Sequence, residues 1–329
     1  QGIDKEEDML SEAVVVADVF GIVQGPKIIE IFQETIKTEF ERVKEENNKE
    51  ATAIYGLLSG MFGEKAVINE EWFKDMAERY KLPALGEIPS NHLFNNEGIH
   101  LQQYFFYDDE DGLASFQSFL TQYKNDPGWQ IEEKENYLHI TSSKEDKKIE
   151  IYANKPENEG EGQGEITEIL KKRDIQPQVI VHRGHSYHTD ETIEKIPPKV
   201  MIVYLGSCGG YNNISAVLEK SPTAHIISTK GRGAMLINDP LLKMLNEEIL
   251  TGKELNWLRF WGMAEEHLGG NGDFKDYIRP NKNVGVLFLK AYYQLTVSSP
   301  ISRVSSLSAH RVASSMGVRE ELTSTDTSS

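Results

Sequence analysis

Short apolar runs, each followed by a polar turn, dominate the middle of the chain. They predict strands at 101–107, 137–141, 148–153, 178–181, 200–205 and 225–228. Apolar residues three or four apart predict helices between or after them, at 113–123, 165–172, 214–220, 240–250 and 257–268. Short apolar runs alternating with helices are typical of an α/β fold with a mostly parallel sheet covered on both faces.

The beginning of the chain has a different, helical pattern. Between 28 and 40, apolar residues recur at spacings of three and four, and Pro26 stands where a first helical turn accepts proline. A further helix is predicted over 70–81. We therefore expect a helical N-terminal region over 1–95 and an α/β domain over 96–295.

Two polar segments and one apolar segment complete the pattern. The Gly-rich stretch 154–164 predicts a loop. The apolar stretch 283–289 fits either a last strand or a helix. The tail 296–329 is rich in Ser and Thr without any period, and we expect it to be disordered.

Composition narrows the function classes. The 329 residues carry a formal net charge of −17, and nucleic-acid binders need a basic face, so we expect no nucleic-acid partner. The apolar run 13–23 is too short to cross a bilayer and is interrupted by Asp18, so we expect no membrane span. The chain begins with Gln1 instead of Met, which favours an exported protein, periplasmic or extracellular, over a cytoplasmic one.

The candidate chemistry lies at the ends of two predicted strands. The segment 179–188 reads VIVHRGHSYH, and the segment 200–210 reads VMIVYLGSCGG and contains the only cysteine, Cys208. Neighbouring strands lie roughly 4.8 Å apart, so parallel strands could bring Cys208 and His185 together. A thiolate is a strong nucleophile, and an adjacent imidazolium lowers the pKa of a thiol and then donates a proton to a leaving amine.

At these two segments the chain resembles the caspase-like (clan CD) cysteine peptidases. In that family a hydrophobic strand ends in His-Gly, and a second one ends in a small residue followed by Cys. Gly184-His185-Ser186 matches the first motif with Ser186 in place of the second glycine, and Ser207-Cys208-Gly209-Gly210 matches the second. The resemblance covers residues 100–290 in strand order and is specific at 179–210.

The resemblance implies a caspase-like three-layer α/β/α fold and a cysteine endopeptidase. It implies Cys208 as the nucleophile of a thioester acyl-enzyme and His185 as the general acid. Main-chain N–H groups of the turns at Gly184, Ser186 and Gly209 would hold the oxyanion. The substrate would be a polypeptide, and the chemistry needs no cofactor and no metal.

Other polar residues near the two motifs are candidates for substrate contacts or for supporting the pair. These candidates are His182, His188, Asp109 and Arg232. The acidic turn with Asp108, Asp109 and Asp111 could accept a basic substrate side chain or could simply be solvated. Arg183 and Arg232 are best interpreted as surface arginines.

Three other readings of the same residues stay open. The domain could be a catalytically degenerate, caspase-like scaffold that binds a partner. His182, His185 and His188 could converge with Cys208 on a zinc ion. The motif Gly206-Ser207-Cys208-Gly209-Gly210 also fits the nucleophile elbow of an α/β-hydrolase similar to dienelactone hydrolase. The further partners would then be Asp239 or Asp273 together with His267.

Overall fold

The apolar runs of the central chain fold into one mixed sheet of eight strands. The computed structural model describes residues 6–23, 25–63, 67–143 and 147–297. The strands of this sheet are β2 (Ile99–Phe106), β3 (Trp129–Glu133), β4 (Tyr137–Ser142), β5 (Lys148–Asn154), β6 (Val179–Arg183), β7 (Ile202–Leu205), β8 (His225–Thr229) and β10 (Tyr277–Ile278). All six predicted strands are confirmed, because runs rich in Val, Ile and Tyr suit strands that are buried on both faces.

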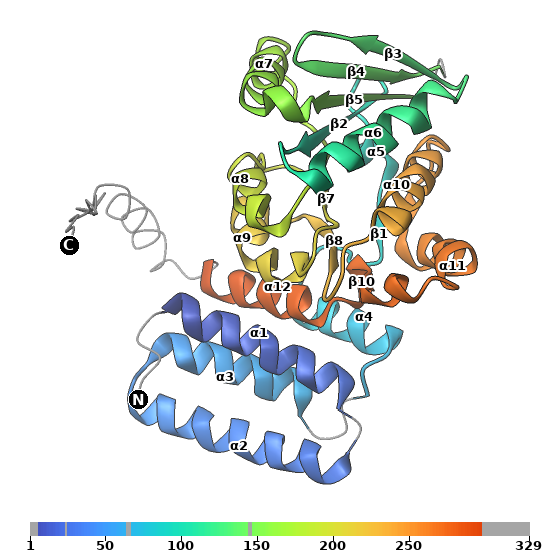
Figure 1. Cartoon of the computed structure of the whole chain (residues 1–329). Helices are drawn as coiled ribbons and strands as arrows, with labels where there is room; N and C mark the ends of the chain where they lie inside the picture. Colours follow the sequence, from blue (N-terminus) through green and yellow to red (C-terminus); the bar gives the residue numbers. More distant parts are fainter. Residues whose placement is uncertain (1–5, 24, 64–66, 144–146, 298–329) are drawn as a thin grey trace, which may run out of the picture.

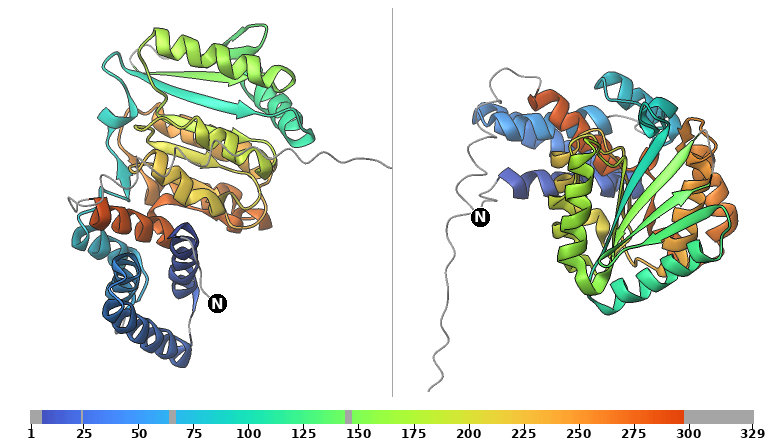
Figure 2. Two further views of the ribbon diagram at one scale, coloured as in Figure 1. Left: turned by 90° about the vertical axis from the view of Figure 1, so that its left-hand side faces the viewer. Right: turned by 90° about the horizontal axis from the view of Figure 1, so that it is seen from above.

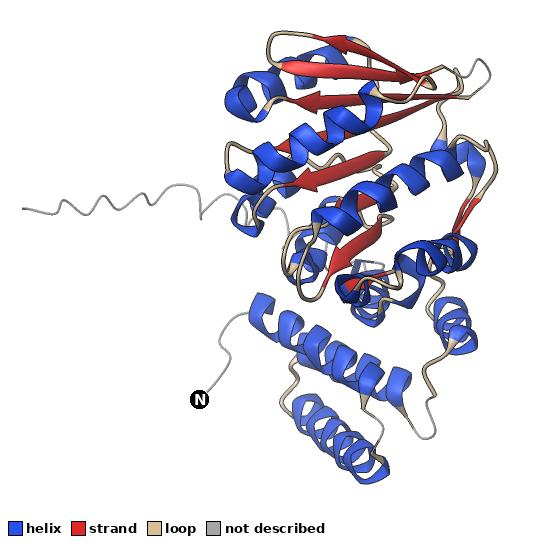
Figure 3. Cartoon of the chain, turned by 45° about the vertical axis from the view of Figure 1, so that its right-hand side comes forward, coloured by secondary structure: helices blue, strands red, loops and turns tan. Residues whose placement is uncertain are grey.

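The strand order is β10-β8-β7-β6-β2-β5-β4-β3. The central strands β8, β7, β6, β2 and β5 are parallel to one another. The outer strands β10 and β4 are antiparallel to their inner neighbours, and β3 is antiparallel to β4. The prediction of a mostly parallel sheet is therefore confirmed, and the central arrows point to the same edge of the sheet (Figure 3).

Helices cover both faces of the sheet (Figure 2). One face carries α7 (Glu159–Lys172), α8 (Thr189–Glu194), α9 (Ile214–Lys220) and α12 (Val284–Val297). The other face carries α6 (Glu110–Lys124), α10 (Met235–Ile249) and α11 (Trp257–Leu268). Side chains alternate between the two cores: Ile180 and Val203 face α9 and α12, whereas Val181 and Ile202 face the other layer.

The N-terminal region adds a further helical layer outside α12 (Figure 1). Its helices are α1 (Glu6–Ile22), α2 (Pro26–Glu45), α3 (Lys49–Phe62), α4 (Glu70–Arg79) and α5 (Ser90–Leu93). The contact of α1 with α12 is close, because a Cβ added at Gly285 would lie 2.8 Å from Cγ1 of Val14. The first helices therefore share one hydrophobic core with the sheet layer.

Short elements connect these layers. A two-stranded sheet pairs β1 (Glu87–Ile88) with β9 (Leu255–Asn256). The segment 1–95, which we expected to be helical, therefore also contains a short strand. The 3₁₀ helices are η1 (Pro156–Asn158), η2 (Ser186–His188), η3 (Gly210–Asn213), η4 (Gly272–Asp276) and η5 (Pro280–Lys282). None of the helices within the described ranges is long and apolar enough to cross a membrane.

One predicted segment differs from the structure, and two others are decided only in part. The stretch predicted as a loop at 154–164 contains η1 and the first turns of α7. Its glycines hid this helix, yet Gly162 is required there because an added Cβ would lie 2.3 Å from the carbonyl oxygen of Asn136. Residues 284–289 lie in helix α12, one of the two predicted outcomes. The tail was expected to be disordered from 296, but α12 continues to Val297, and the rest of the tail lies outside the described residues.

Candidate active site

The strands that end in the two candidate residues are neighbours. β6 and β7 are parallel, and their last register pair is His182 with Leu205. His185 and Cys208 each follow this pair by three residues, so both lie just beyond the ends of adjacent strands. Both are accessible, since Cys208 is exposed and the side chain of His185 is 45% exposed.

Contacts next to the pair join the two strand ends. The hydroxyl oxygens of Thr189 and Ser207 lie 3.4 Å apart, and both side chains are buried. The hydroxyl of Thr229, at the end of β8, donates to the carbonyl oxygen of Ser207. The residue before Cys208 is therefore fixed to the segments that follow β6 and β8.

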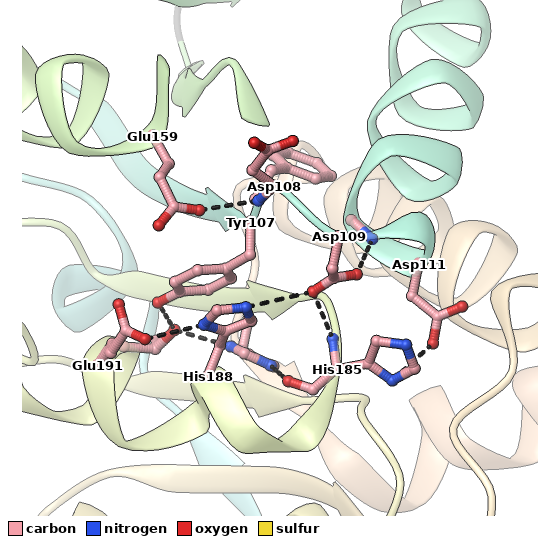
Figure 4. Close-up of polar contacts among 12 residues, drawn as sticks. Tyr107, Asp108, Asp109, Asp111, Glu159, His185, His188 and Glu191 are labelled. Atoms are coloured by element: carbon pink, nitrogen blue, oxygen red, sulfur yellow. Dashed lines mark hydrogen bonds and ion pairs between the residues drawn. The ribbon is translucent and has the colours of Figure 1, made fainter. Parts of the chain in front are cut away.

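The imidazole of His185 has an acidic and an aromatic neighbour. Its Nδ1 lies 3.3 Å from Oδ2 of Asp111, at the start of α6, and Figure 4 shows the two side chains facing each other. Its ring stacks on the exposed ring of Tyr187 with centroids 5.2 Å apart. Asp111 therefore lies where it can orient the ring, a role that the sequence did not predict because Asp111 precedes His185 by 74 positions.

Asp109 anchors the main chain of the histidine segment. Its carboxylate accepts the N–H of Gly112 at 2.7 Å, which caps α6, and the N–H of His185 at 3.2 Å. The carboxylate is only 7% exposed. These contacts agree with the supporting one of the two roles predicted for Asp109.

His188 lies on the inner side of the same segment. Its Nδ1 is 2.8 Å from Glu191, its Nε2 is 3.5 Å from Asp109, and its ring stacks on Tyr107 at 4.3 Å (Figure 4). These contacts hold η2 and the first turn of α8 against the end of β2. The predicted supporting role of His188 agrees with this placement.

His182 is fully buried and cannot touch a substrate, which corrects that part of the prediction. Burial lowers its pKa to about 4, so the ring is neutral at pH 7. Its Nε2 lies 3.1 Å from the carbonyl oxygen of His185 and must donate there, so Nδ1 accepts the hydroxyl proton of Thr192 at 2.8 Å. His182 thus supports the backbone of His185.

The turn that carries Cys208 is tightly packed. Gly209 has a φ of +65°, which favours glycine, and its N–H donates to the carbonyl oxygen of Gly231 at 2.9 Å. The predicted oxyanion donor Gly209 is therefore already occupied, which corrects that assignment. Gly184 lies close to Asp109, whereas Ser186 is exposed at the start of η2.

A buried amide that the sequence analysis missed fixes the end of β7. Nδ2 of Asn238 donates to the carbonyl oxygen of Gly206 at 3.1 Å, and its Oδ1 accepts the hydroxyls of Tyr204 and Tyr277. A Cβ at Gly206 would lie 2.3 Å from that Oδ1. No signal in the sequence linked Asn238 to the cysteine turn.

Arg183 is not a surface arginine, which corrects that interpretation. Its side chain is 2% exposed and lies 2.6 Å from Oδ1 of Asp239, whose other oxygen accepts the hydroxyl of Ser118. Burial of the guanidinium forces this pairing. Arg232 is exposed, and its main-chain N–H donates to Asp276 at 2.9 Å.

Two of the residues that the α/β-hydrolase alternative would use, Asp239 and His267, make other contacts. Asp239 is engaged by Arg183, Asp273 lies in η4, and His267 is exposed on α11 with its Nδ1 2.8 Å from the carbonyl oxygen of Met263. Within the described part of the chain, no group of three or more His, Cys, Asp or Glu residues could hold a metal ion.

No family model, curated protein or solved structure matches this chain.

Proposed function

We propose that the protein is a caspase-like cysteine endopeptidase with a Cys208–His185 dyad. The observation that supports the proposal is that β6 and β7 are adjacent and parallel, so that the two accessible residues follow neighbouring strand ends. Reactive groups of open parallel sheets gather at this edge. The dyad needs only these two groups, and the described residues around them hold both main chains in place.

The reaction would follow the order of other thiol peptidases. The Cys208 thiolate attacks the peptide carbonyl carbon, and the carbonyl oxygen becomes an oxyanion. His185 then donates a proton to the leaving amine, which leaves a thioester on Cys208. A water molecule, deprotonated by His185, hydrolyses the thioester and releases the carboxylic acid and the free thiol.

Main-chain amides supply the oxyanion site of this scheme. The amides of His185 and Gly209 already donate to Asp109 and to Gly231. The donors that we propose are therefore the N–H groups of Ser186 and Cys208. Serine retains a main-chain N–H, so its presence in place of glycine preserves this donor.

Asp111 would complete the site as the residue that orients His185. A carboxylate 3.3 Å from Nδ1 can hold the ring in one orientation, with the other ring nitrogen turned away from Asp111. The pair is largely exposed, so its electrostatic contribution is small.

A peptide-library cleavage assay tests the proposal. The wild-type protein should cleave a subset of peptides, and Cys208→Ala and His185→Ala should each reduce hydrolysis by at least about a thousandfold, as loss of a nucleophile or its base does. His267→Ala is the matched control, since His267 is an exposed histidine on α11, and it should retain wild-type activity. Equal cleavage by wild type and Cys208→Ala, or no cleavage at all, would contradict the proposal.

A further inference from the structure

One carboxylate connects the N-terminal helical region to the turn that carries Cys208. Asp18 lies on α1, and its Oδ1 accepts the hydroxyl of Tyr211 at 2.7 Å. Its Oδ2 lies 2.9 Å from the ammonium of Lys230. Asp18 thus contacts the segments that follow β7 and β8, although it precedes Tyr211 by 193 positions.

Tyr211 follows Cys208 by three residues, and its side chain is buried in η3, directly after the turn that carries Cys208. A phenol has one proton to donate, and its oxygen lies nearer to Asp18, at 2.7 Å, than to Oδ1 of Asn283, at 3.1 Å. Burial and the negative charge of Asp18 raise the pKa of Tyr211, so the hydroxyl stays protonated. A hydrogen bond to a carboxylate is stronger than one to an amide, so Asp18 is its main anchor.

Lys230, in the segment that follows β8, also contacts Tyr211 next to the turn that carries Cys208. Its ammonium lies 4.4 Å from the centre of the Tyr211 ring as well as beside Asp18. The next residue, Gly231, accepts the N–H of Gly209 at 2.9 Å. The Asp18 carboxylate therefore holds both the exit of the cysteine turn and the neighbouring segment to which the turn is hydrogen-bonded.

We propose that Asp18 is a positioning residue for Cys208, and that α1 is thereby an integral part of the active site. The inference rests on the proposed function, because it concerns the same cysteine. Without the carboxylate, Tyr211 can turn to Asn283, and Lys230 loses its anionic partner. A cavity of about 230 Å³ borders Asp18, Tyr211 and Lys230 and gives these side chains room to move. The thiol would then leave the orientation in which His185 can activate it.

Alkylation of Cys208 by iodoacetamide tests the inference without a substrate, since the chain has one cysteine. Rates are compared at about pH 6, where a thiol needs an imidazolium partner to ionise, and at about pH 9.5, where free thiols are ionised anyway. The ratio of the two rates reports the pairing with His185, whereas a general loosening of the fold changes both rates. The variants are Asp18→Ala, Tyr211→Phe and their double mutant, with Glu12→Gln, an exposed residue on the same helix, as control.

Each single variant should lower the ratio about tenfold, as misplacement of a reacting group by a fraction of an ångström does. The double mutant should lose no more than Asp18→Ala alone, because Asp18→Ala already removes the hydrogen bond that Tyr211→Phe removes. Glu12→Gln should leave the ratio unchanged. An unchanged ratio in Asp18→Ala, or multiplied losses in the double mutant, would overturn the positioning role.

The failures of the two proposals are distinguishable. An unchanged ratio in Asp18→Ala together with a low ratio in His185→Ala would remove the role of Asp18 and keep the dyad. A lowered ratio in Asp18→Ala without any library cleavage by the wild type would keep the positioning role and remove the peptidase.

Discussion

Histidines at the carboxyl ends of the strands differ in their surroundings from histidines at the amino ends. At the carboxyl ends of the strands, His185 and His188 lie beside the carboxylates of Asp111, Asp109 and Glu191. At the amino ends, His100 and His225 are completely buried in β2 and β8, and burial lowers the pKa of both. The contrast separates ionisable side chains that have charged partners from buried ones for which the described residues supply none.

Lys290 is the clearest example of a buried ionisable side chain whose pKa is lowered by burial. It lies on α12 beside His225, is 5% exposed, and its ammonium has no hydrogen-bond partner among the described residues. Burial lowers its pKa to about 7. A perturbed pKa alone therefore does not identify a functional site in this chain, and accessibility together with a charged partner is the better criterion.

The largest expected effect is that of Lys290 on the free energy of unfolding of the protein. Between pH 7 and 10.5 the unfolded chain keeps a proton on Lys290 that the folded chain has released, so the free energy of unfolding rises with pH. Lys290→Met should remove this dependence and stabilise the protein at pH 7 by roughly 3–5 kcal/mol, because each pH unit is worth about 1.4 kcal/mol. Urea unfolding at several pH values measures both effects.

Arg183→Met is the matched comparison for Lys290→Met. Arg183 is similarly buried but has Asp239 as its partner, so its removal leaves the largely buried Asp239 carboxylate without its cation. The same substitution should therefore destabilise the protein by about 3–5 kcal/mol. Stabilisation by Arg183→Met, or destabilisation by Lys290→Met, would break the distinction between the two edges.

The smallest expected effect concerns the exposed pair at the carboxyl-end edge. Asp111→Asn keeps the shape of the side chain and removes the charge beside His185. Exposed ion pairs contribute at most about 1 kcal/mol, so peptide hydrolysis should fall only two- to fivefold. Asp108→Asn, three positions earlier and also exposed, should leave the rate unchanged. A loss of a hundredfold in Asp111→Asn would show that Asp111 does more than orient the ring.

The sequence predicted the parts of the fold that are buried on both faces. β6, β7 and β8 are built on the short apolar runs VIV, IVYL and II, and these runs set the order of His185 and Cys208 along one edge. The edge strand β3 was missed because its residues are mostly exposed and lack an apolar run. α12 was ambiguous because it is packed between the sheet and α1, which makes it apolar on nearly every side.

The supporting contacts of the site could not be predicted, because they join residues that are distant in the sequence. Asp111 reaches His185 and Asn238 reaches Gly206 only after the sheet and α10 have packed. Asp18 was noted only as an interruption of an apolar run, although it contacts Tyr211 and Lys230 in the fold. Periodicity predicts which face of an element is buried, but not which polar side chains meet across layers.

The rate of Cys208 alkylation at about pH 6, in the wild type and in His185→Ala, tests the central claim most directly, because an isolated thiol is almost unreactive there. We predict rapid alkylation of the wild type and a rate at least about tenfold lower in His185→Ala, with His267→Ala unchanged. Equal rates in the wild type and in His185→Ala would show that the imidazole and the thiol do not act together, and would contradict the account.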